Sequence, residues 1–85
     1  MKHAGPEALD LLEPLLAKIR KHPALKEKKR GLFYLKGKSF LHFHEDPAGL
    51  FADLFLGKDS WRLRVSRRNE QEALLAKIRT LLSAA

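Results

Sequence analysis

The chain has 85 residues, of which 45% are hydrophobic, and a formal net charge of +7. This length allows one small domain, and this hydrophobic content excludes a wholly disordered chain. Because the sequence has no cysteine, no apolar run of membrane-spanning length and no apolar signal-peptide core, disulfides and thiolate zinc sites are excluded and a soluble, cytoplasmic protein is predicted.

The positive charge is concentrated in one segment. Between residues 18 and 38, nine Lys and Arg residues stand against one acid, Glu27. Such a local cluster is typical of proteins that bind nucleic acid or an acidic protein partner, although a soluble Lys-rich linker has the same composition. The candidate anion or nucleic-acid contacts are Lys26, Lys28, Lys29 and Arg30. The abundance of Lys, Arg and Glu without Cys is also typical of thermophile proteins.

The first expected helix begins at Gly5-Pro6, because proline is favoured in the first helical turn. Its apolar residues recur at helical spacing, at Leu9, Leu12, Leu16 and Ile19. Pro14 is expected to kink or restart this helix, and His22-Pro23 ends it. Residues 24–30 are interpreted as a charged linker or a short helical turn.

A β region follows, and it holds every aromatic residue of the chain. Strands are predicted at 31–35, 40–45, 50–56 and 61–65, with short connections that favour an antiparallel meander. A second helix follows, capped by Ser66 or Asn69 and continuing to Leu82. The sequence therefore predicts a single small α+β domain over residues 1–85 in the order α-β-β-β-β-α, with a four-stranded antiparallel meander and both helices packed on one face.

Period-two alternation sorts the strand residues into two faces. Turns at 46–49 and 57–60 would place Glu45 opposite Leu50 and Leu56 opposite Trp61. One face is then wholly apolar, with Leu41, Phe43, Ala52, Leu54, Leu56, Trp61, Leu63 and Val65. The other face is the predicted binding face, with Phe40, His42, His44, Phe51, Asp53, Phe55, Arg62 and Arg64. The first hairpin leaves the face of Tyr34 open, since a two-residue turn and a three-residue turn give opposite answers.

This register places His42, Asp53 and Arg64 in one row across three strands. We expect Asp53 to be ionised between its two partners, and we expect the protonated form of His42 to be favoured. A structure with Asp53 far from both partners would contradict the register.

Two kinds of chemistry are considered for the binding face. His42 and His44, with carboxylates nearby, have ligand types that suit zinc, nickel or non-haem iron, but no third histidine is expected near them. His42 and Asp53 make two parts of an acid-base relay, but no nucleophile stands in a suitable motif. The sequence therefore predicts no catalytic residue, no metal site and no cofactor, and it favours a non-enzymatic protein.

Recognition is the remaining class of function. Lys36 to Phe43 partly fits an RNA-recognition signature, but Lys38 replaces a stacking aromatic and the element order differs, so no family is assigned. Exposed phenylalanines on the binding face favour a protein partner or a homodimer, unless the first helix covers them. The leading interpretation is a binding module that uses this face for self-association or a protein partner. Nucleic-acid binding through residues 18–38 and the sheet aromatics is the alternative, and a metal-dependent activity at His42 and His44 comes third.

Overall fold

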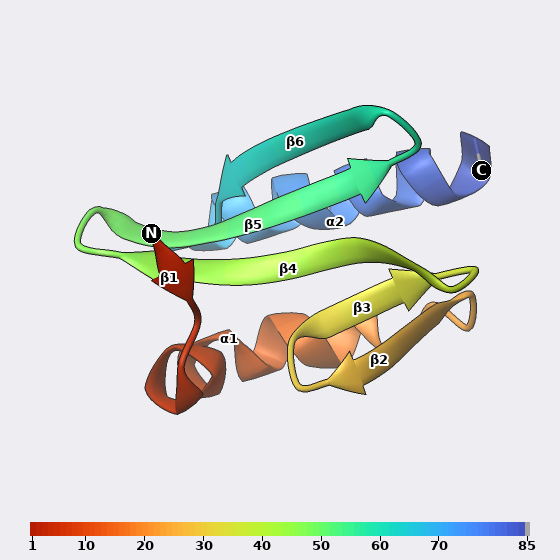
Figure 1. Ribbon diagram of the computed structural model, residues 1–85. Helices are drawn as coiled ribbons and strands as arrows, with labels where there is room; N and C mark the ends of the chain where they lie inside the picture. Colours follow the sequence, from red (N-terminus) through yellow and green to blue (C-terminus); the bar gives the residue numbers. More distant parts are fainter. Residues whose placement is uncertain (85) are drawn as a thin grey trace.

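A computed structural model describes residues 1–84 as two helices and an antiparallel sheet, shown in Figure 1. The helices are α1 (Pro6–Ile19) and α2 (Arg68–Ala84). The strands are β1 (Lys2–His3), β2 (Leu25–Lys29), β3 (Leu32–Leu35), β4 (Lys38–Asp46), β5 (Gly49–Leu56) and β6 (Asp59–Arg64). Strands β2 to β6 lie in sequence order, and β1 pairs with β4. Both helices lie on the same side of the sheet (Figure 1), so the predicted α+β architecture is confirmed.

The sheet has two strands that the sequence did not predict. Strand β2 occupies the segment interpreted as a charged linker. Its alternation was missed because its half-buried residues, Leu25 and Glu27, stand among exposed lysines. Lysines of this kind are common on edge strands, where they discourage pairing with other chains. Strand β1 has two residues, too few for any periodicity to mark it.

The hydrophobic core lies between the two helices and one face of the sheet. Helix α1 begins at Pro6 and continues through Pro14, which is exposed. The helices bury Leu12, Leu15, Leu16 and Ile19 from α1, with Leu74, Ile78 and Leu81 from α2. On the sheet, the predicted apolar face is found in this core: Leu41, Phe43, Ala52, Leu54 and Val65 are buried, and Leu56, Trp61 and Leu63 pack around them.

The second helix starts differently from the prediction. Asn69 lies inside α2, and Ser66 accepts a hydrogen bond from the Leu50 backbone N–H at 2.9 Å. The backbone N–H of Arg67 donates to the Glu70 carboxylate at 2.9 Å. This acid in the first turn satisfies a donor that the helix leaves unpaired, so neither predicted cap is used.

The register of the central hairpin is confirmed, whereas the last hairpin is shifted by two residues. His42 faces Asp53 and Glu45 faces Leu50, as expected. The turn between β5 and β6 contains only Gly57 and Lys58, so Asp53 faces Arg62 and not Arg64. A shift of two residues keeps every side chain on its predicted face, and the sorting into faces therefore survives the error.

Strand β4 contains a bulge that the alternation did not predict. Phe33 pairs with Leu41 but Tyr34 pairs with Ser39, which leaves Phe40 as the extra residue. A bulge turns two successive side chains toward the same side, and Phe40 is accordingly buried in the core beside Leu41. The prediction that Phe40 belongs to the binding face is therefore wrong.

The length of the first hairpin turn determines the position of Tyr34. The first hairpin has a two-residue turn at Lys36-Gly37, and both residues have positive φ angles. This matches the turn type that suits the twist of a tight hairpin. Tyr34 lies between the buried Phe33 and Leu35 and is itself half-buried, so it points to the side of the sheet opposite the helices.

Candidate functional site

The side of the sheet opposite the helices is the candidate functional site, and we call it the open face. It carries the side chains of His3, Tyr34, His42, His44, Phe51, Asp53, Phe55, Arg62 and Arg64. Neither helix covers it (Figure 1). All the residues predicted for this face except Phe40 are found there, while His3 and Tyr34 are additions.

Asp53 occupies the centre of the open face and is 7% exposed. Arg62 donates two hydrogen bonds to its carboxylate, from Nε at 2.7 Å and from Nη2 at 3.0 Å. These bonds lower the pKa of Asp53 against the opposing effect of burial, which favours the ionised carboxylate, but the partner is Arg62 and not the predicted Arg64. The second partner is His44, whose Nε2 lies 3.0 Å from Oδ2 of Asp53.

His42 does not behave as expected, although it is the cross-strand neighbour of Asp53. Its Nε2 contacts the hydroxyl of Ser39, and its ring meets the edge of Phe55 at 5.5 Å between centroids. Burial lowers the pKa of His42, and the neighbouring His3 and His44 lower it further. Asp53 opposes this with a smaller effect, so the prediction that the protonated form is favoured is wrong.

These contacts do not assemble an acid-base relay. Ser39 contacts His42, but the carboxylate that would orient such a histidine is held by His44 and Arg62. A relay needs the carboxylate on the histidine that contacts the hydroxyl. The geometry thus offers no activated nucleophile at these residues.

His3 reaches the open face through β1, where it is the direct partner of His44. Its ring stacks on that of His44 at 4.8 Å and lies 6.0 Å from that of His42, measured between centroids. Two hydrogen bonds fix the chain after it: Ala4 N–H to the Phe43 carbonyl at 3.1 Å, and Gly5 N–H to Glu45 at 2.6 Å. The sequence carried no signal for this approach, because a two-residue strand has no pattern and its partner is about 40 residues away.

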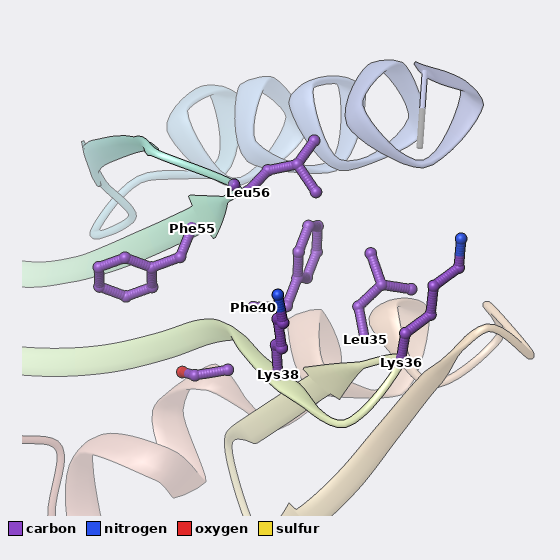
Figure 2. A pocket seen from close by; sticks show the side chains of 8 residues that line it. Leu35, Lys36, Lys38, Phe40, Phe55 and Leu56 are labelled. Carbon is purple, nitrogen blue, oxygen red and sulfur yellow. The ribbon is translucent and has the colours of Figure 1, made fainter.

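A pocket of 410 Å³ lies at the opposite end of β4 (Figure 2). Pairing between β4 and β5 stops at Leu41 and Leu54, and the strands diverge beyond that point. Leu56 points toward α2 and Phe55 points away from it (Figure 2), and Phe55 is 36% exposed. Two lysines, Lys36 and Lys38, complete an otherwise mostly apolar lining made of Leu35, Ser39, Phe40, Phe55, Leu56 and Gly57.

In the basic segment, residues 18–38, the two arginines are paired with acids and the lysines are not. Arg30 pairs with Asp10 and Glu13, each at 2.8 Å, on the side of α1. Arg20 pairs with Glu27 at 2.6 Å and also with Glu13. Within residues 1–84, no ion pair involves the lysines of this segment, which are Lys18, Lys21, Lys26, Lys28, Lys29, Lys36 and Lys38.

Two of these lysines extend the open face across β2. Lys26 is the cross-strand partner of Tyr34. The ammonium of Lys28 lies 4.7 Å from the centroid of the Tyr34 ring, a cation–π contact. Of the four predicted anion contacts, Lys26 and Lys28 therefore border the open face, Lys29 is exposed on β2, and Arg30 is held at α1.

Comparison with known proteins adds no family to this description. No family model matches the chain, and no curated protein or solved structure matches it either. Neither of the described helices has the length and apolarity needed to cross a membrane.

Proposed function

We propose that the protein binds single-stranded nucleic acid at the pocket where β4 and β5 diverge and along the adjoining open face, without catalysing a reaction. The observation that carries this proposal is the juxtaposition of the exposed ring of Phe55 with Lys36 and Lys38 around one pocket. Any of the bases can stack on an exposed aromatic ring, and a nearby ammonium group attracts the adjoining phosphate. A broad, uncovered sheet face suits an extended strand, whereas reading a duplex requires an element narrow enough to enter a groove.

The electrostatics of the open face support the same ligand. Lys26 and Lys28 flank Tyr34, which supplies a second aromatic surface. The acids nearest to this face are already engaged by donors: Asp53 by Arg62, Glu45 by the Gly5 N–H and Asp46 by the Ala48 N–H. Their negative charge is therefore partly compensated, and the uncompensated lysines dominate the field that an approaching polyanion meets.

Self-association and an acidic protein partner are the competing proposals for this face. The burial of Phe40 removes one of the three phenylalanines that favoured a homodimer. Among residues 1–84, Phe55 at 36% is the most exposed large apolar side chain of the open face. A stable dimer interface needs a larger apolar area. We retain both alternatives as outcomes of the test, and we retain the expectation of a cytoplasmic location, where single-stranded nucleic acid is available.

The proposal is tested by fluorescence anisotropy with a labelled mixed-sequence single strand and with a duplex, at 50 and 200 mM salt. We expect preference for the single strand and an affinity that falls roughly 50-fold between the two salt concentrations, the value for four phosphate contacts. Phe55→Ala should weaken binding by about 5- to 150-fold, the range for loss of one stacked base. Leu11→Ala, a change at an exposed apolar residue of α1, is the matched control and should have no effect.

A double change of Lys36 and Lys38 to Ser should weaken binding and reduce its salt dependence. The same change at Lys18 and Lys21, at the end of α1, is the control for loss of charge alone. Equal effects of the two double changes would show that the nucleic acid is held only by non-specific charge attraction and not at the pocket. Absence of binding at 50 mM salt would overturn the proposal. Light scattering on the same samples detects a homodimer. A dimer that dissociates in Phe55→Ala would show that the open face serves self-association, and it would overturn the proposal.

A further inference from the structure

Three histidines converge on the open face, where β1 pairs with β4. His3 comes from β1, and His42 and His44 come from alternate positions of β4. One ring nitrogen from each lies within 4.8 Å of the ring nitrogens of the other two. The geometry points to a site for a divalent transition-metal ion, with Zn²⁺ as its most suitable occupant, held by His3, His42 and His44.

The strongest support comes from the two nitrogens of His44. Its Nε2 lies 3.0 Å from Oδ2 of Asp53, and Arg62 holds the same carboxylate from the other side. Because Nε2 faces this carboxylate, Nδ1 is the ring nitrogen left for a metal ion. Nδ1 is buried and has no hydrogen-bond partner in the described structure. A buried acceptor without a partner carries a free-energy cost, which a metal ion at that nitrogen would remove.

The contact between His44 and Asp53 also matches the second shell of known metal sites. A histidine ligand generally donates its other ring N–H to a carboxylate, carbonyl or water, which orients the ring and raises its basicity. Arg62 holds Asp53 with two hydrogen bonds, so this carboxylate is itself fixed. In His42 the Nε2 atom contacts the Ser39 hydroxyl, so Nδ1 is the ring nitrogen outside that contact.

His3 provides the adjustable part of the site. Nitrogens bound to one tetrahedral Zn²⁺ lie about 3.4 Å apart, since each Zn–N bond is about 2.0–2.1 Å long. The present separations are somewhat larger, and the exposed His3 side chain can rotate to close them while His42 and His44 are held by Ser39 and Asp53.

The donor set determines which ions fit. Three imidazoles suit Zn²⁺, Ni²⁺ and Cu²⁺, whereas Mg²⁺ and Ca²⁺ require oxygen ligands. Three protein ligands leave at least one coordination position for water or another small ligand. This inference does not rest on the proposed function, because metal binding requires only the three histidines and nucleic acid takes no part in the test.

The test is a Zn²⁺ titration by isothermal calorimetry on the purified 85-residue chain, stripped with a chelator and without nucleic acid. We expect saturable binding of one ion per chain at micromolar concentration, and a rise in the melting temperature on adding Zn²⁺. His3→Ala, which alters an exposed side chain, should weaken binding by more than about tenfold and abolish the thermal shift. His22→Ala is the matched control, because His22 lies between α1 and β2 and should leave both results unchanged.

A second variant examines the role of Asp53. Asp53→Asn should weaken Zn²⁺ binding by about 10- to 100-fold, as expected for loss of a carboxylate behind a histidine ligand, with folding checked by circular dichroism. Titration with Co²⁺ should give visible absorption bands typical of a tetrahedral site in the wild-type protein and not in His3→Ala. Absence of saturable Zn²⁺ binding, or equal binding by wild type and His3→Ala, would show that the three histidines are only packed together and would overturn the inference.

Discussion

The two faces of this sheet are built from the same strands but are stabilised in different ways. On the covered face, Phe33, Phe43 and Leu54 are at most 2% exposed and meet the apolar sides of both helices. On the open face, the most buried residue is a carboxylate, Asp53, held by Arg62 and His44 without any helix above it. The covered face therefore gains its stability from apolar burial, whereas hydrogen bonds and ion pairs hold the polar groups of the open face in place.

The largest expected difference between the faces concerns two phenylalanines. Phe40→Ala should lower the free energy of unfolding by about 3–5 kcal/mol, the cost of deleting a fully buried ring. Phe55→Ala should cost only about 1 kcal/mol, because Phe55 is 36% exposed and loses mainly its edge contact with His42. Urea unfolding followed by the fluorescence of Trp61, the single tryptophan, measures both. Similar losses would mean that Phe40 lies on the open face and that the bulge is absent.

A smaller effect is expected from the ionic centre of the open face. The pKa of Asp53 is lowered in the folded state by Arg62, so its contribution to stability is complete above the unfolded pKa of about 3.9. It is lost as the pH falls through the lower pKa of the folded state. The contribution should be about 1 kcal/mol, since Arg62 is half exposed.

Thermal unfolding between pH 7 and pH 2 tests this prediction. Asp53→Asn should lose less stability than the wild type as the pH falls, because it lacks the titrating carboxylate. Asp59→Asn, at an exposed carboxylate in the β5–β6 hairpin, is the control and should retain it. If Asp53→Asn and wild type lose stability in parallel over this pH range, Asp53 is not stabilised by the ion pair.

The smallest effect is expected at the polar rim of the covered face, where Arg20 links Glu27 of β2 to Glu13 of α1. Glu27→Gln keeps an acceptor for the Gly31 N–H and removes only the charge. Exposed ion pairs contribute little, so we expect a loss of a few tenths of a kcal/mol that disappears in 0.5 M salt. Urea unfolding at low and high salt measures it, and a loss above about 1 kcal/mol that salt does not change would show that the link is structural.

The sequence predicted the covered face well because, along these strands, every second residue is apolar and every second side chain points toward the helices. Leu41, Phe43, Ala52 and Leu54 stand at alternate positions, and the shift of the last hairpin by two residues leaves them where they were expected. The single failure on this face, Phe40, occurs where a bulge breaks the period. A bulge follows from the fit between neighbouring strands, which one strand's pattern does not reveal.

The candidate site was only partly predictable. Alternation placed His42, His44, Asp53 and Arg62 on one face, but it could not say which histidine would hold Asp53. That choice depends on side-chain rotamers and on Ser39, which the bulge brings next to His42. His3 and Tyr34 were missed for topological reasons: β1 is too short to show a pattern, and the face of Tyr34 depended on the length of a turn.

The attachment of β1 also has a consequence for the order in which the molecule folds. The hairpin of β4 and β5 closes over a two-residue turn, whereas the bond between Gly5 and Glu45 closes a loop of about 40 residues. Contacts between distant parts of a chain form late, because the entropy of loop closure precedes any gain from the contact. We therefore expect β1 to dock onto a meander that has already formed. His3 would then join His42 and His44 in the last steps of folding, so an ion held by the three would report completion of the fold and would not template it.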